Sequence, residues 1–303
     1  MKNLYLVIAP ILMLGFSSCV VHVHFQDSAT LNEYHYPTKN QNVCGFLKER
    51  VVVYSVFVDV NSVHPWSLYD INSTTDSIKR AVEWIESQAT SAGVKLDIDA
   101  VSHKHGNKFS LRESSNPNLQ LELEDVYGER RKNLRNLTNW SDDISKRCGR
   151  YFKERKADKV ATPNRANDLE RFVAALRSKY ETDNVVLLFH INGYYERMSS
   201  AAFWTGHTER VEYGIVTYKN PAVIAHEVLH IFGAEDLYPH PENSSFNFNA
   251  IAERYPYEIM RATYPDISKL RISPITKYLI GWQDSLDFAD MRLLYHKIDF
   301  ANY

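Results

Sequence analysis

This chain lacks a strong charge of either sign, internal repeats and heptad runs. Its formal net charge is only −2 over 303 residues, and its apolar content is ordinary for a folded protein. Nothing in this composition favours disorder or a nucleic-acid partner. The length allows one large domain or two modest ones, and we expect a monomer.

Cysteine is also scarce, with only three residues in the chain: Cys19, Cys44 and Cys148. None of them belongs to a C-x-x-C pair, so we assign no cysteine to a metal site. In an exported protein Cys44 and Cys148 could form a disulfide, and the alternative for each is a buried free thiol.

The apolar run at the N-terminus, Leu4 to Phe16, is too short for a comfortable membrane span. It follows Lys2 and precedes Ser17-Ser18, which is typical of a secretory signal over residues 1–18. Cys19 follows directly and resembles the lipidated cysteine of bacterial lipoproteins, although Phe16 stands where that family usually carries an aliphatic residue. The resemblance implies export from a bacterial cell and a lipid anchor at Cys19, and the alternative is a periplasmic or secreted protein.

Residues 19–43 are polar and lack periodicity, which predicts a tether before a folded domain at 44–303. We expect an N-terminal subdomain at 44–232, with a polar insertion around 103–163, and a smaller C-terminal subdomain at 233–303.

Hydrophobic periodicity predicts a β-α-β opening, whose strands usually lie side by side and parallel. The predicted elements are a strand at 50–60, a helix at 75–91, strands at 94–101 and 119–126, helices at 142–154 and 167–180, and strands at 184–192 and 211–218.

The most specific pattern is HExxHxxGxxD, from His226 to Asp236. On a helix, two histidines four residues apart face the same way and can bind one metal ion. The intervening Glu227 then points to the open side of that metal. Asn220-Pro221 should start this helix, because Asn is a good N-cap and Pro fits the first helical position. Gly233 should end it with a left-handed residue.

The order of these elements, with the motif helix last, is similar to the N-terminal half of metzincin-type zinc peptidases. Gly233 to Tyr238 and Thr276 to Trp282 also resemble secreted bacterial peptidases of the immune-inhibitor-A type. The resemblance implies an α+β or α/β fold: a twisted mixed sheet with packed helices, a zinc-binding helix and a mostly irregular or helical C-terminal subdomain. It further implies that Tyr257-Glu258-Ile259-Met260 forms a methionine turn under the metal.

The third metal ligand is the open point in this pattern. Most members of that clan carry His there, whereas this chain has Asp236, a variant of some bacterial metzincin-like enzymes. Asp236 fits the spacing best, since Gly233 reverses the chain toward the metal. Glu235, His240 and Glu253 remain alternatives.

We therefore expect an exported zinc endopeptidase with one catalytic Zn²⁺ held by His226, His230 and Asp236. Glu227 would act as the general base that takes a proton from the attacking water and passes it to the leaving amine. Because one carboxylate replaces a third imidazole, we expect an activity optimum shifted to higher pH. The resemblance also implies that the strand at 211–218 is an edge strand, which would pair with an extended peptide or protein substrate, and the alternative is an ordinary strand paired on both sides.

Two rival functions remain at this stage. One is a binding lipoprotein that keeps the peptidase fold without turnover, and the intact Glu227 argues against it. The other is a zinc hydrolase that acts on a non-peptide amide, such as a cell-wall linkage.

Overall fold

The structure is a computed structural model that describes residues 46–61, 63–103, 110–112, 130–149, 167–193, 200–203, 211–239 and 246–294. The expected signal peptide, Cys19 and the tether lie outside the described residues, as do Cys44 and the strand predicted at 119–126. Within the described ranges, no helix has both the length and the apolar character needed to cross a bilayer.

The described strands form one mixed sheet of six strands, in the order β2-β1-β4-β6-β5, with β3 paired to the end of β1. Neighbouring strands run parallel, except that β5 is antiparallel to β6. The strands are β1 (Glu49–Asp59), β2 (Leu96–Ser102), β3 (Ser110–Arg112), β4 (Asn184–Ile191), β5 (Ala201–Phe203) and β6 (Tyr213–Val216). The predicted mixed sheet and the parallel β-α-β opening are confirmed.

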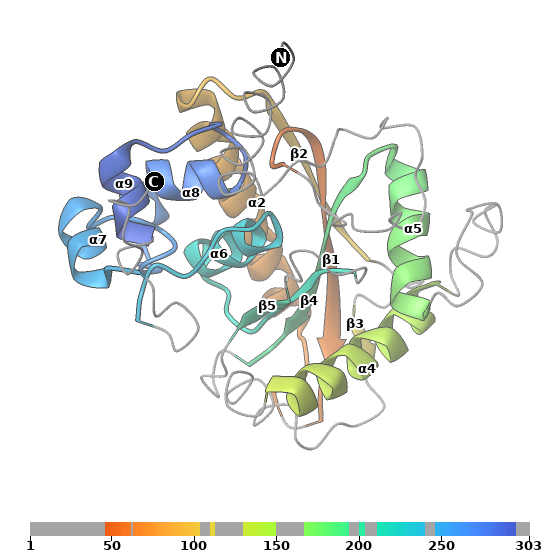
Figure 1. Cartoon of the computed structure of the whole chain (residues 1–303). Helices are drawn as coiled ribbons and strands as arrows, with labels where there is room; N and C mark the ends of the chain where they lie inside the picture. Colours follow the sequence, from red (N-terminus) through yellow and green to blue (C-terminus); the bar gives the residue numbers. More distant parts are fainter. Residues whose placement is uncertain are drawn as a thin grey trace, which may run out of the picture.

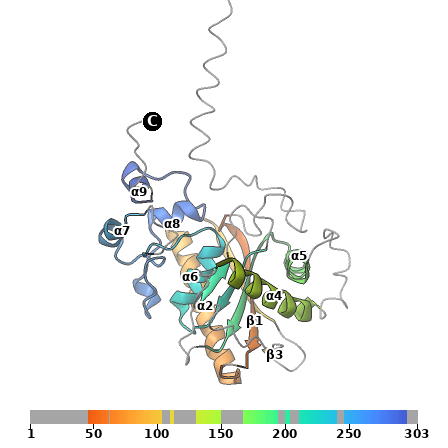
Figure 2. The same cartoon turned by 60° about the horizontal axis from the view of Figure 1, so that its bottom comes forward.

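Helices cover both faces of the sheet (Figures 1 and 2). The helices α2 (Leu68–Ser91) and α6 (Pro221–Ile231) lie on one side, and α4 (Arg130–Gly149) and α5 (Asp168–Tyr180) lie on the other. This layering explains the composition of the central strands: β1 is buried continuously over residues 51–58. A strand covered on both faces reads as an unbroken apolar run rather than an alternating one.

Helix α2 begins at Leu68, seven positions before the predicted start at Thr75. Ser67 caps its N-terminus: the Ser67 hydroxyl accepts a hydrogen bond from the Asp70 backbone N–H at 3.1 Å, and the Asp70 carboxylate accepts from the Ser67 backbone N–H. This capping box starts the helix at the exposed Leu68 and Tyr69, which the apolar periodicity did not indicate.

Helix α4 is described from Arg130 to Gly149, so it includes twelve residues before the predicted helix at 142–154, and residues 150–154 of that prediction lie outside the described residues. Its buried face carries Leu137 and Ile144 at helical spacing, but Ser141 and Ser145 are buried on it as well. Small hydroxyl residues on the inner face therefore masked the apolar stripe. Cys148, also in α4, is a buried free thiol, so of the two predicted states of Cys148 the free thiol is observed. Burial raises the pKa of this thiol.

The prediction that 211–218 is an edge strand is wrong. The strand here, β6, lies between β4 and β5 and pairs with both. The last strand on this path of the described sheet is β5, which sequence periodicity missed because three residues are too few to show alternation. Gly214 in β6 marks a close approach of the neighbouring strand, because a Cβ there would lie 2.7 Å from the Leu188 side chain.

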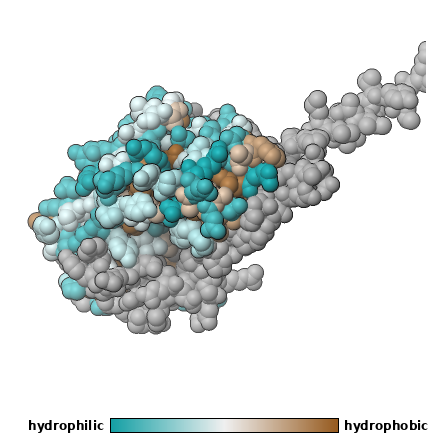
Figure 3. All heavy atoms as spheres, turned by 90° about the vertical axis from the view of Figure 1, so that its left-hand side faces the viewer, coloured by the Kyte–Doolittle hydropathy of each residue, from teal (hydrophilic) through white to brown (hydrophobic). Residues whose placement is uncertain are grey.

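The C-terminal part packs outside α6 (Figure 1) and is built of short helices joined by irregular segments, as expected. They are α7 (Phe248–Arg254), a 3-10 turn (Ile267–Lys269), α8 (Pro274–Leu279) and α9 (Phe288–Leu294). Seen from this side, the described surface is mostly hydrophilic (Figure 3).

Gly281 and Trp282 follow α8, and hydrogen bonds in this region join the C-terminal part to the start of the described chain. The indole N–H of Trp282 donates to the carbonyl of Leu47 at 2.6 Å, and the N–H of Leu47 donates to the carbonyl of Ile280 at 3.1 Å. Gly281, with φ +78°, lets the Phe46 ring pack against its backbone.

Candidate metal centre

Local sequence fixes both ends of α6, the helix that carries the motif. The side chain of Asn220 caps it by accepting from the N–H of Ala222 at 2.9 Å, and Pro221 occupies the first turn. At the other end Gly233 has φ +93°. The N–H of Ala234 donates to the backbone carbonyl of Leu229, and the N–H of Gly233 donates to the backbone carbonyl of His230. This is the hydrogen-bond pattern of a Schellman cap. The predicted start and stop signals are confirmed, and this cap turns the chain back along the helix.

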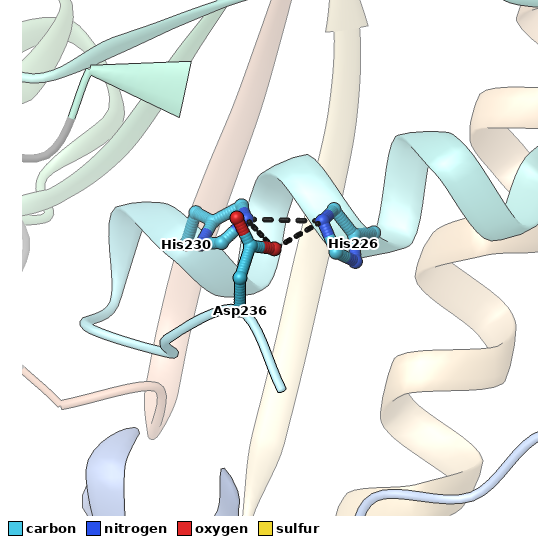
Figure 4. Close-up of side chains that lie close together, drawn as sticks. All are labelled: His226, His230 and Asp236. Atoms are coloured by element: carbon cyan, nitrogen blue, oxygen red, sulfur yellow. Dashed lines mark hydrogen bonds and ion pairs between the residues drawn. The ribbon is translucent and has the colours of Figure 1, made fainter. Parts of the chain in front are cut away.

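Three electron-pair donors converge beside α6 (Figure 4). The Nε2 atoms of His226 and His230 are 3.0 Å apart, and Oδ1 of Asp236 lies 3.2 Å from each. Ligands around a tetrahedral Zn²⁺ at its usual bond lengths are separated by about 3.3 Å. The group is therefore buried and compact enough to hold a metal ion.

Two backbone carbonyls fix the orientation of the imidazoles. The Nδ1 of His226 lies 3.1 Å from the carbonyl oxygen of Ile259, and the Nδ1 of His230 lies 2.7 Å from that of Ala234. A carbonyl can only accept, so both Nδ1 atoms must carry the hydrogen. In the neutral rings, each Nε2 then presents a lone pair to the shared point, as metal ligation requires.

The charges of this group are strongly coupled. Burial alone would lower the pKa of His230, but the Asp236 carboxylate outweighs it and raises the pKa to about 9. Burial likewise opposes ionisation of Asp236, yet the two imidazoles hold the pKa of that carboxyl well below its usual range. In the metal-free protein, His226, His230 and Asp236 would thus share a proton. A bound metal ion would replace that proton.

Glu227 lies on the same helix, next to the first histidine. Its side chain is only 5% exposed, and its Oε2 has no hydrogen-bond partner among the described residues. Burial raises the pKa of Glu227, and the neighbouring histidines offset part of this effect. An unsatisfied buried carboxylate is costly, so this oxygen calls for a further ligand or a water.

A segment far along the chain completes the surroundings of the ligands. The carbonyl of Ile259 holds His226, and the carbonyl of Met260 accepts from the N–H of Leu237 at 2.9 Å. Met260 is fully buried. Sequence reasoning included this segment for its methionine but missed the role of the Ile259 and Ala234 carbonyls, because backbone groups leave no mark in a side-chain pattern.

Among the residues proposed as third ligand, the structure brings only Asp236 to the two histidines within the described part of the chain. Glu235 is adjacent in sequence but is not part of this group. Glu253 lies exposed on α7, and His240 falls outside the described residues. The Schellman cap explains the choice, because it aims the third residue after Gly233 at the imidazoles.

Comparisons of the chain with protein-family models, curated proteins and solved structures found no match. The fold class and the candidate metal-binding group are therefore inferred from the structure of this chain and not from a related protein. The chain is a mixed α/β protein with a buried His-His-Asp group that could hold a metal ion.

Proposed function

We propose that this protein is a metzincin-like zinc endopeptidase in which His226, His230 and Asp236 hold one catalytic Zn²⁺. The observation that carries the proposal is the convergence of the three donors within 3.2 Å of one another, with the buried Glu227 beside them. Two neutral imidazoles and one carboxylate are a common ligand set of catalytic zinc, which keeps a fourth position open.

The backbone contacts support a site prepared for metal. Both imidazoles have their Nδ1 hydrogens engaged by carbonyls, so neither ring needs to change tautomer before it binds. One unit of negative charge from Asp236 offsets part of the charge of a divalent ion. The partners of the two histidines are neutral backbone carbonyls and add no further negative charge, so the total charge of the metal-bound centre would stay positive.

Glu227 is the residue that would move protons. As a general base it would accept a proton from the attacking water through its unpartnered Oε2, and then deliver that proton to the departing amine. Its burial, which raises its pKa, makes the protonated form accessible for the second half of this cycle. Zinc, when bound, supplies Lewis-acid chemistry: it polarises a carbonyl and lowers the pKa of a water.

The substrate would be a peptide or a protein in extended form. Since β6 is paired on both sides, it offers no free edge to a substrate. Strand β5, which pairs with β6 on one side, replaces it as the candidate for main-chain pairing with a peptide. Export and a lipid anchor at Cys19 remain part of this proposal, and they depend on the sequence of residues 1–19.

Bound zinc and cleavage of casein by the wild type and Glu227→Gln test the proposal. We expect one zinc per chain in both proteins, and loss of cleavage by at least about 100-fold in the variant, because a general base typically contributes 10²–10⁴-fold. Glu253→Gln is the matched control, since it makes the same change on an exposed helix and should keep full activity.

Equal cleavage by the wild type and Glu227→Gln would reject Glu227 as the base. Zinc binding without cleavage of any peptide would favour the rival functions. A wild type that then hydrolyses cell-wall muropeptides is an amide hydrolase, and one that hydrolyses neither substrate is a binding protein on a peptidase-like fold.

A further inference from the structure

Glu258 is a buried carboxylate outside the ligand group, and it collects three hydrogen bonds. Its side chain is 1% exposed. Oε1 accepts from the N–H of Met260 at 3.1 Å and from the hydroxyl of Thr276 at 3.0 Å, and Oε2 accepts from the N–H of Ser273. No cation pairs with it among the described residues, so these three donors provide its compensation for lost water.

The three donors come from two separate pieces of chain. Ser273 is the N-cap of α8 and Thr276 lies in the first turn of that helix, whereas Met260 belongs to the segment that contacts the metal ligands. Backbone bonds run alongside: the N–H of Ile259 donates to the carbonyl of Arg271 at 3.1 Å. The carboxylate of Glu258 thus fastens the segment 258–260 to the start of α8.

Two consecutive carbonyls of that segment contact one proposed metal ligand and the residue that follows another. The carbonyl of Ile259 accepts from Nδ1 of His226 at 3.1 Å. The carbonyl of Met260 accepts from the N–H of Leu237 at 2.9 Å, one residue after Asp236. Any shift of the segment therefore moves the imidazole of His226 and the carboxylate of Asp236 relative to His230, whose own carbonyl partner, Ala234, belongs to the helix cap.

We propose that Glu258 is a positioning residue of the metal centre, which sets the placement of His226 and Asp236 through the carbonyls of Ile259 and Met260. The inference rests on the proposed metal site and adds a residue that touches no ligand itself. In this proposal Glu258 does more than join the segment 258–260 to α8. The position of the α8 N-terminus also affects the arrangement of His226, His230 and Asp236.

The chemistry of the side chain suggests a sharp substitution. All three partners of Glu258 are donors, and a carboxylate is an acceptor only. In Glu258→Gln one oxygen becomes an NH₂ group, which cannot accept from the N–H of Ser273 or from the donors of Oε1. The variant keeps the volume and loses at least one bond of the network. Thr276→Val is a milder change, because it removes one donor and leaves the carboxylate in place.

Asp290→Asn is the matched control. Asp290 is also 1% exposed, lies in the same C-terminal part of the chain, and accepts from the hydroxyl of Tyr255 at 2.6 Å. It also pairs with Nε of Arg254 at 2.9 Å, and none of its hydrogen bonds or ion pairs among the described residues reaches the Ile259 or Met260 carbonyl. The control therefore repeats the change of a buried carboxylate to an amide without removing a bond to those two residues.

The experiment measures zinc affinity by chelator competition and the visible spectrum of the Co²⁺-substituted full chain, with circular dichroism to verify folding. We expect Glu258→Gln to weaken zinc binding by about 10–100-fold, the usual effect of losing an outer-shell partner, and to shift the Co²⁺ bands. Thr276→Val should move both readouts less in the same direction, and Asp290→Asn should move neither.

An unchanged zinc affinity and Co²⁺ spectrum in folded Glu258→Gln would overturn the inference, as would equal changes in Asp290→Asn. If Glu258→Gln does not fold, Thr276→Val decides in its place, and unchanged readouts there overturn it. A wild type that binds neither Zn²⁺ nor Co²⁺ refutes the proposed metal site itself, which separates the two failures.

Discussion

The Nε2 atoms of His226 and His230 lie 3.0 Å apart, each with its Nδ1 hydrogen engaged by a backbone carbonyl. Two lone pairs therefore face each other, and the carboxylate of Asp236 adds a third donor at 3.2 Å. Such a contact is repulsive unless a proton or a cation lies between the donors. We therefore expect the same three side chains to control metal affinity and the response of the metal-free protein to pH.

Asp236→Asn should weaken zinc binding by at least about 100-fold, since loss of a direct anionic ligand exceeds the 10–100-fold effect of outer-shell changes. Chelator competition on purified protein measures this. Glu235→Gln is the control at the adjacent position and should retain the wild-type affinity. A normal affinity in Asp236→Asn, with loss in Glu235→Gln, would assign the third ligand to Glu235 instead.

Zinc affinity should rise with pH. The pKa of His230 in the metal-free protein is raised to about 9, against an ordinary value of 6.5. The interaction of protonated His230 with Asp236 therefore stabilises the folded, metal-free protein below pH 6.5, and this stabilisation is lost as pH rises toward 9. Because zinc must displace that proton, the apparent Kd should fall by about tenfold per pH unit across this window. A Kd independent of pH would contradict the shared proton, and Asp236→Asn should show a shallower slope.

His190 should make the protein sensitive to acid. It is fully buried on β4, its Nε2 lies 3.1 Å from the Ser55 hydroxyl, and its Nδ1 has no hydrogen-bond partner in the described part of the chain. Burial lowers its pKa to about 3. Between pH 6.5 and 3, His190 is therefore protonated in the unfolded chain but not in the folded protein. The free energy of unfolding falls as pH drops through this range.

Urea unfolding at a series of pH values measures this effect, which amounts to about 1.4 kcal/mol per pH unit for one group. His190→Gln can keep a bond to Ser55 but cannot titrate, so its stability should decline less steeply with acid. Because the carboxylates contribute equally in both proteins, identical slopes would show that His190 does not titrate on unfolding.

Gly281→Ala should destabilise the fold by about 2–4 kcal/mol, the combined effect of a left-handed backbone and an overpacked contact. A Cβ at this position would lie 2.0 Å from Cδ1 of Phe46. Gly93→Ala is the control, because Gly93 also has a positive φ of +71° but has nothing within 4 Å of the added atom. Urea unfolding of both variants separates the strain from the clash.

The double variant Phe46→Ala, Gly281→Ala provides a second check on this contact. Removing the ring makes room for the methyl group, so the penalty of Gly281→Ala should fall to that of Gly93→Ala. Strictly additive effects would mean that the ring moves aside at little cost.

Much of the fold could be predicted because it follows from local signals. The β-branched runs at β1 and β4, and the apolar spacing of α5, indicate their structures without reference to the rest of the chain. The misses share a physical cause. The capped start of α2 exposes Leu68 and Tyr69, the inner face of α4 carries serines, and β5 has three residues, so none of them produces a clear hydrophobic period.

For the metal group, the sequence by itself determined the helix, the common face of His226 and His230, and the reversal at Gly233, because caps and helical spacing act over a few residues. Only the tertiary structure decided what surrounds them. The carbonyl that holds His226 comes from Ile259, 33 positions away, and Glu258 joins that segment to α8. Backbone carbonyls are the same at every residue, so only the packed chain can show which of them meets a ligand.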